Sequence, residues 1–188
     1  MQSGKRIPRI GLLCMILRRV LQFVRALFAR VSTEDKAFVE KNLAPELQRF
    51  FYDLSVPDQC HALRVARNAA ALAKKKPTGT VEMPLLLRCA LLHDIGRKKG
   101  DLGTWWKSFA VLFAAFCPDL ARSYGEDASD GILGRKMHVY FHHPQIGAEF
   151  LLQKDLGKEA EIVRKHHEAP AEDDPPELRI LRMADEMH

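Results

Sequence analysis

The amino-acid sequence predicts an all-α protein, with one globular helical domain over residues 32–188 and a basic amphipathic helix over residues 1–31. Apolar residues recur at the three- and four-residue spacing of a helix in most segments. No segment shows the sustained alternation of apolar and polar residues that is typical of a half-buried strand. The length of 188 residues, with 47% hydrophobic and 28% charged residues, is sufficient for a domain with a buried core.

The basic character of the chain is confined to its N-terminal segment. Residues 1–31 contain 7 of the 29 basic residues and no acidic one, whereas the other 22 basic and 24 acidic residues give residues 32–188 a net charge of −2. We therefore expect no nucleic-acid partner for the domain. The apolar residues between Ile7 and Val31 have helical spacing. Two interpretations of this helix remain open: it packs on the domain or on a second copy, or it lies on an anionic membrane surface.

The cellular location can also be predicted. Arg18 and Arg19 interrupt the first apolar stretch, which is unlike a secretory signal peptide. The chain contains no run of about 20 uncharged apolar residues that could form a spanning helix. The four cysteines are scattered and include no C-x-x-C pair, as expected of reduced thiols. These features predict a cytoplasmic protein, which the N-terminal helix could hold at the periphery of a membrane.

The first half of the domain is expected to form four helices, which cover residues 33–42, 45–54, 58–73 and 84–94. Ser32 or Thr33 is a typical N-cap for the first of them. Pro45 and Pro84 are typical of the first turn of a helix. The third segment is rich in residues of high helix propensity.

The second half begins with the least regular part of the chain, residues 97–137. This part combines an aromatic run over 105–116 with a Gly-rich polar stretch over 125–134. Its role remains open between a lid or packing element and a second membrane-facing element. Three further helices are predicted over residues 141–152, 159–167 and 177–188. Gly147 and Ala148 would allow the first of these helices to approach a neighbour closely.

The sequence His93-Asp94-Ile95-Gly96 ends a helix that is apolar on most sides. Gly96 stands where a C-cap glycine is expected. Asp94 lies near the negative end of the helix dipole, where a carboxylate is unfavourable unless a cation offsets it. Because His93 is beside it, a bound metal ion is the natural candidate for that cation.

Other residues that can bind metal lie in or at the ends of the predicted helices. Singly, each histidine is more often an ordinary core or surface residue. Together, five histidines and two aspartates are enough for two metal ions, whereas a closed structural zinc site needs four ligands and usually includes thiolates. The candidate ligands are His61, His93, Asp94, His143, His166, His167 and Asp185.

In the order of these residues the sequence resembles the HD-domain superfamily of metal-dependent phosphohydrolases, and in particular the subgroup with two adjacent histidine ligands. The resemblance covers residues 58–188. His143 rather than His142 matches the third family motif, because it precedes the proline. The matching motifs are HxxRVA at 61–66, HDIG at 93–96, HPxxG at 143–147, HHE at 166–168 and a closing A-D at 184–185.

The resemblance implies a helical bundle that holds two divalent metal ions, with iron or manganese foremost and cobalt or zinc as alternatives. Such a pair, about 3.5–4 Å apart, activates a shared water for in-line displacement at phosphorus. The implied activity is hydrolysis of a phosphodiester or phosphomonoester, and the implied partner is a nucleotide or another phosphorylated small molecule. One ion would be held by His61, His93, Asp94 and Asp185, and the other by His143, His166 and His167, with Asp94 bridging both.

Two basic residues, Arg97 and Lys98, directly follow the HDIG motif, where the family usually has lysine first. The resemblance implies that they serve catalysis together with Asp94, by contacting the substrate phosphate. Exposed loop charges are the alternative interpretation. Residues 169–174 read APAEDD and not the DGxGYP sequence of the subgroup that cleaves cyclic di-GMP, so that specificity is not predicted.

Two other functions remain as alternatives. Some proteins of the same fold are oxygen-dependent di-iron enzymes, but these generally lack the second adjacent histidine, so His166 and His167 together favour hydrolysis. The other alternative is a non-enzymatic interaction module, tethered to a membrane or a partner by the basic N-terminal helix. The complete set of candidate ligands argues against a module without chemistry.

Overall fold

The structure is a computed structural model that describes residues 29–75, 80–97 and 131–187. Within these ranges it contains seven α-helices and no strand, which confirms the all-α prediction. Residues 29–31 are not helical, and the rest of the predicted N-terminal helix, like the aromatic run at 105–116, lies outside the described residues. The helices are α2 (Thr33–Asn42), α3 (Pro45–Tyr52), α4 (Val56–Lys75), α5 (Met83–Leu92), α8 (Gly131–Leu152), α9 (Gly157–Lys165) and α10 (Pro176–Glu186).

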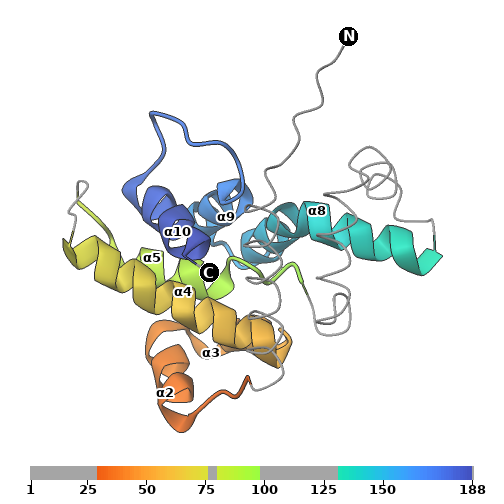
Figure 1. The fold of residues 1–188 in the computed structure, drawn as a ribbon, viewed down its shortest axis with the longest axis horizontal. Coiled ribbons are helices and arrows are strands. Elements are labelled where there is room, and N and C mark those ends of the chain that lie inside the picture. Colours follow the sequence, from red (N-terminus) through yellow and green to blue (C-terminus); the bar gives the residue numbers. More distant parts are fainter. Residues whose placement is uncertain (1–28, 76–79, 98–130, 188) are drawn as a thin grey trace, which may run out of the picture.

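Helix α5 is the centre of the fold. It packs against α2, α3, α4, α9 and α10, and in Figure 1 it lies between α4 and the pair formed by α9 and α10. A helix that is apolar around most of its circumference has to be covered by neighbours in this way. Its buried residues are Leu85, Leu86, Cys89, Ala90, Leu91 and Leu92. Because α5 runs through the core, its C-terminal end delivers the next two residues, His93 and Asp94, to the interior, where each is only 1% exposed.

Helix α8 begins ten residues earlier than the sequence predicts, at Gly131 instead of Phe141. The prediction was wrong because the Gly-rich polar stretch over 125–134 was taken as part of an irregular segment. Gly134 is buried within the helix, and Pro144 lies in its interior. Proline has no amide hydrogen to donate to the carbonyl four residues earlier, that of Tyr140. The Nδ1–H group of His143 donates to this carbonyl instead, at 2.9 Å, so the helix continues through the proline.

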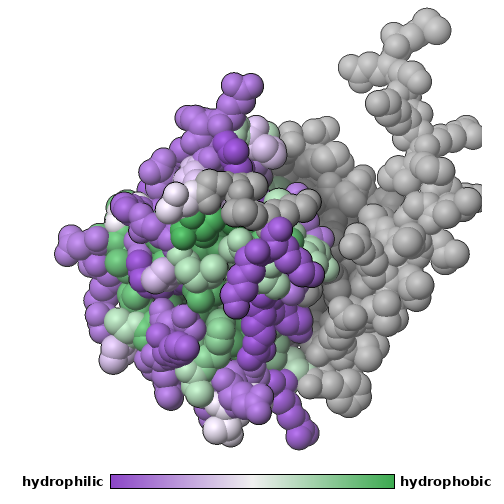
Figure 2. Space-filling view, turned by 90° about the vertical axis from the view of Figure 1, so that its left-hand side faces the viewer, coloured by the Kyte–Doolittle hydropathy of each residue, from purple (hydrophilic) through white to green (hydrophobic). Residues whose placement is uncertain are grey.

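The other helices lie close to their predicted positions. Ser32 caps α2 through a capping box with Asp35, in which the Ser32 side chain accepts from the Asp35 amide and the Asp35 carboxylate accepts from the Ser32 amide. No helix in the described ranges has both the length and the apolar character needed to cross a bilayer. Figure 2 shows one face of the molecule, on which hydrophilic side chains predominate over the described helices and hydrophobic ones form smaller areas between them.

Candidate metal centre

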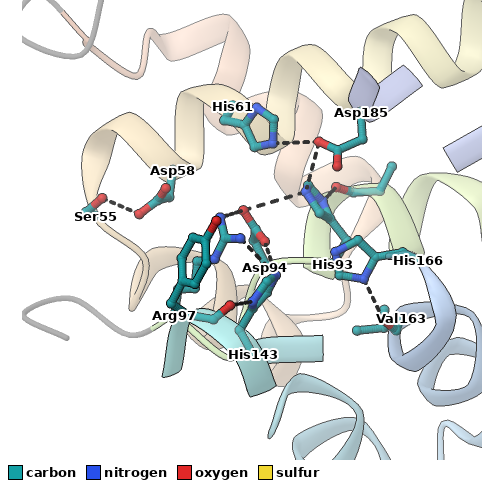
Figure 3. Close-up of polar contacts among 12 residues, drawn as sticks. Ser55, Asp58, His61, His93, Asp94, Arg97, His143, Val163, His166 and Asp185 are labelled. Atoms are coloured by element: carbon teal, nitrogen blue, oxygen red, sulfur yellow. Dashed lines mark hydrogen bonds and ion pairs between the residues drawn. The ribbon is translucent and has the colours of Figure 1, made fainter. Parts of the chain in front are cut away.

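Side chains from five helices or their ends converge at the C-terminal end of α5, and all seven candidate ligands are among them. Figure 3 labels these residues except His167. We call these seven residues the ligand cluster. Their ligand atoms form three overlapping groups in which all atoms lie within 4.8 Å of one another. The groups are His61 with His93 and Asp94, His143 with His166 and His167, and His93 with His166 and Asp185. The second group contains the same residues as one implied set, and the first contains the other implied set without Asp185. The third shows that His93 and His166 lie where the two sets meet.

Gly96 allows the end of α5 to approach α8 closely, beside the pair formed by Asp94 and His143. A Cβ atom at Gly96 would lie 2.1 Å from the carbonyl oxygen of His143 and 2.8 Å from its Cα atom. From the other side, a Cβ atom at Gly147 would lie 3.3 Å from the Gly96 nitrogen, so Gly147 does allow close approach, as predicted. The C-cap role predicted for Gly96 is wrong, because the only described glycine with positive φ is Gly131. Gly96 is required for close packing of backbones and not for a left-handed conformation.

Three histidines of the ligand cluster are held in the same way. The Nδ1 atom of each contacts the backbone carbonyl three residues earlier: His93 contacts Ala90 at 2.8 Å, His143 contacts Tyr140 at 2.9 Å and His166 contacts Val163 at 2.6 Å. Since a carbonyl oxygen can only accept, Nδ1 carries the hydrogen in each ring. In the tautomer with its hydrogen on Nδ1, each ring has the Nε2 lone pair directed toward the cluster, as a metal ligand requires.

Several atoms of the cluster have no hydrogen-bond partner among the described residues. These buried atoms are Nε2 of His93, Oδ1 of Asp94 and Nε2 of His166. The Nε2 lone pair of His93 lies 3.7 Å from carboxylate oxygens of both Asp94 and Asp185, an arrangement of acceptors that is unfavourable without a cation. The residues therefore fit a site for divalent metal ions with imidazole and carboxylate ligands.

The electrostatics of the cluster favour the neutral imidazole at His143, His166 and His167 and the ionised carboxylate at Asp94. Burial alone would raise the pKa of Asp94, but the guanidinium of Arg97 and the neighbouring side chains of His93 and His143 together outweigh burial and hold this pKa well below its usual value. Burial and Arg97 lower the pKa of His143 to about 4. Burial also lowers the pKa values of His166 and His167. Metal ions bind neutral imidazole and ionised carboxylate, so these ligands are in the state required for binding near neutral pH.

His61 and Asp185 form the outer edge of the cluster. Nε2 of His61 lies 2.9 Å from Oδ1 of Asp185, and about a fifth of each side chain is exposed. Burial opposes ionisation of Asp185, but the hydrogen bond from His61 and the charge interactions with His93 and His61 together outweigh burial and lower the pKa of Asp185. At this edge α4, which carries His61, packs against α10, which carries Asp185.

Comparison of the sequence with known proteins identifies the family of this chain. The family model of the HD domain matches residues 59–188, more than two thirds of the chain. The chain belongs to the HD domain family. None of the curated proteins and none of the solved structures matches it. HD domains are divalent-metal-binding proteins, mostly metal-dependent phosphohydrolases, and the cluster of this HD domain lies entirely within the matched residues.

Of the two basic residues predicted to contact substrate, the structure describes Arg97, whereas Lys98 lies outside the described residues. Arg97 is neither a solvated loop charge nor directed outward, because only 17% of its side chain is exposed and its guanidinium points into the ligand cluster of the HD domain. Its Nη1 atom donates to Oδ2 of Asp94 at 2.8 Å. A role for Arg97 toward phosphate stays a prediction.

Of the adjacent residues His142 and His143, the structure places His143 in the ligand cluster. His143 is 2% exposed and its Nε2 atom lies 3.2 Å from Oδ1 of Asp94. The ring of His142 lies instead against that of His138, one turn earlier on α8, with ring centroids 4.5 Å apart. The HD domain therefore directs His143, and not its neighbour, toward Asp94.

A buried ion pair that supports the cluster was missed in the sequence. Arg182 of α10 and Asp174 are 8% and 7% exposed, and Nη1 of Arg182 donates to Oδ2 of Asp174. The Nη2 atom of Arg182 donates to the carbonyl of Lys165 at 2.8 Å, directly before His166. The available signal was the position of Arg182, three residues before Asp185, on the face of α10 that packs into the core.

We expect Arg182→Met to disturb both the stability of the HD domain and the ligands at the end of α9. The change leaves Asp174 and the Lys165 carbonyl without their buried donor, and breaking a buried ion pair by removing one partner is strongly destabilising. The melting temperature should fall on the order of 5–10 °C. Differential scanning calorimetry can test this, with Arg49→Met as the control, because the Arg49 side chain is 86% exposed in its pair with Asp53 and should have almost no effect. Equal melting temperatures of the two variants would contradict a supporting role for Arg182.

Proposed function

We propose that this HD domain is a phosphohydrolase that acts on a phosphodiester or phosphomonoester of a nucleotide and uses two divalent metal ions. The observation that supports this proposal best is the position of Asp94 between two sets of ligands. Asp94 belongs to one group with His61 and His93, and its Oδ1 atom lies 3.2 Å from Nε2 of His143, a member of the other. A carboxylate shared by two ligand sets is the arrangement that a bimetallic site requires.

The residues have separate roles in this proposal. His61, His93 and Asp185 would complete one metal site with Asp94, and His143, His166 and His167 the other. The metal ions would supply Lewis acidity, which lowers the pKa of water and neutralises charge on a phosphoryl group. The protein contributes imidazoles whose orientation is fixed by backbone carbonyls. The ligand atoms are therefore held in place before the metal binds, and metal binding costs little side-chain conformational entropy.

Iron or manganese suits this donor set best, with cobalt or zinc as alternatives. Five imidazoles and two carboxylates are a poor match for magnesium, which prefers oxygen ligands and retains several waters. The adjacent pair His166 and His167, whose ring centroids are 4.0 Å apart, supports hydrolysis over oxygen-dependent chemistry in the same fold. Arg97 and Lys98 would contact the substrate phosphate, Arg97 after leaving its contacts inside the cluster.

The test is metal reconstitution followed by a substrate panel. Protein treated with a chelator and then loaded with manganese, iron, cobalt, zinc or magnesium is assayed with aryl phosphate monoesters and diesters and with common nucleotides. We expect hydrolysis that depends on the added metal. Oxygen consumption without phosphate release would overturn the proposal in favour of a di-iron oxygenase, and the absence of any metal-dependent turnover would favour an interaction module.

A matched pair of variants tests the ligand assignment in the same assay. His143→Ala should lower metal-dependent turnover by more than about 100-fold, because it removes an Nε2 ligand beside Asp94. His142→Ala changes the adjacent histidine, whose ring lies against His138, and should leave turnover within about 3-fold of the unmodified protein. The reverse order of effects would show that the wrong histidine has been assigned.

A further inference from the structure

The guanidinium of Arg97 lies among the proposed metal ligands. Its Nη1 atom donates to Oδ2 of Asp94 at 2.8 Å, and its Nη2 atom contacts Nε2 of His143 at 2.9 Å (Figure 3). The two contacts join residues from separate elements, the end of α5 and the interior of α8. With its side chain 17% exposed, Arg97 acts as part of the buried cluster.

The atoms that Arg97 contacts are acceptors that would otherwise repel each other. The hydrogen on Nδ1 of His143 is used by the Tyr140 carbonyl, so Nε2 presents a lone pair. This lone pair lies 3.2 Å from Oδ1 of Asp94, which is ionised. A cation is needed to hold these two groups together in a buried setting. The planar guanidinium meets this need with two parallel donors.

A divalent ion at the His143 side of the cluster would need the same two partners. Asp94 would bridge to it and Nε2 of His143 would be its ligand, and both are engaged by Arg97 in this structure. A guanidinium and a metal ion so close together would also repel each other strongly, because screening is weak in a buried site. The Oδ2 atom of Asp94 that accepts from Arg97 also lies 3.7 Å from Nε2 of His93, so this contact touches both ligand sets. The contact between Arg97 and His143 falls on the second set alone.

We infer that Arg97 is an internal counter-cation that competes with the second metal ion for Asp94 and His143, so that the two metal sites load unequally. This inference rests on the proposed bimetallic function and adds an order of loading to it. The site built from His61, His93 and Asp185 binds its ion first. The ion at His143, His166 and His167 binds more weakly, because Arg97 has to move out before Asp94 and His143 can act as ligands.

The test is a calorimetric titration of chelator-treated protein with Mn²⁺. The unmodified protein should show one tight and one weak binding event, and His143→Ala should remove the weak event. Arg97→Gln removes the competing charge and should tighten the weak event by at least about 10-fold, within the usual range of coupling between sites. The tight event should change much less. Arg67→Gln is the matched control, since Arg67 is also ion-paired, with Asp35 on α2 at 2.6 Å, but lies outside the cluster.

The outcomes separate the inference from the proposed function. Two binding events with the same affinities in Arg97→Gln and in the unmodified protein would overturn the role of Arg97 and leave the bimetallic site intact. A weaker second event in Arg97→Gln would overturn it as well. Binding of no metal ion by any of these proteins would overturn the proposed function and this inference with it.

Two measurements guard against a variant that fails to fold. Arg97→Lys keeps the positive charge but has a single ammonium group, which cannot reproduce the two parallel contacts, so it should bind the second ion with intermediate affinity. A crystal structure of the unmodified protein with two equivalents of Mn²⁺ should show Arg97 away from Asp94 and His143. If both Arg97 contacts persist beside two bound ions, the inference is wrong.

Discussion

Asp94→Asn is expected to abolish metal-dependent turnover and to weaken metal binding at both sites by more than about 100-fold. Asp94 is 1% exposed, belongs to one group with His61 and His93, and lies 3.2 Å from Nε2 of His143 in the other group. Asparagine has nearly the same shape, but its side chain is neutral and offers one oxygen instead of two. The change therefore removes the shared anionic ligand with little change in packing.

Atomic absorption of dialysed protein and the phosphatase assay measure the two effects of Asp94→Asn, and circular dichroism checks that the helical content is retained. Asp53→Asn is a suitable control, because Asp53 is an exposed carboxylate whose side chain is 51% accessible. It should leave both metal content and turnover unchanged. Full metal content together with full turnover in Asp94→Asn would rule out the bridging role of Asp94 and with it the proposed mechanism.

Gly96→Ala is expected to have the largest effect on folding, a loss of about 3 kcal/mol or more in the free energy of unfolding. The added methyl group would lie 2.1 Å from the His143 carbonyl oxygen and 2.8 Å from the carbonyl carbon and Cα. These are backbone atoms in the interior of α8, so a side-chain rotation cannot relieve the contact. Moving α8 outward would also separate His143 from Asp94, and we expect the ion at the His143 side to be lost.

Equilibrium denaturation by urea, followed by circular dichroism, measures this loss. Gly157→Ala is the matched control, since a Cβ atom at Gly157 would meet nothing within 4 Å. It should change stability by no more than about 0.5 kcal/mol. If Gly96→Ala were as stable as Gly157→Ala, the close approach of the two backbones would not be a requirement of the fold.

Much of the fold could be predicted from the sequence because most helices carry local signals. Ser32, one of the two predicted N-caps, does cap α2, and prolines mark the first turns of α3 and α5. The start of α8 was predicted incorrectly at Phe141, because the Gly-rich stretch over 125–134 carries no helix signal. What retains Pro144 within α8 is a hydrogen bond made by the side chain of His143. Such a hydrogen bond cannot be predicted from the spacing of apolar residues along the chain.

The composition of the ligand cluster could be predicted, and its internal contacts could not. The order of histidines and aspartates along the chain is a property of the sequence, and these residues do come together in space. The inward turn of Arg97 depends on how close α8 comes to the end of α5, which the sequence does not give. The same holds for Arg182, whose partners are Asp174 in the loop before α10 and the carbonyl of Lys165 at the end of α9.

The proline after His143 has a chemical consequence for the imidazole before it. His93 and His166 make the same ring-to-carbonyl contact directly after the last residues of α5 and α9. His143 makes it in the interior of α8, where the residue that follows an ordinary histidine would donate its own amide hydrogen to that carbonyl. The His-Pro pair therefore gives the middle of a long helix a ring orientation that the other two histidines adopt at helix ends.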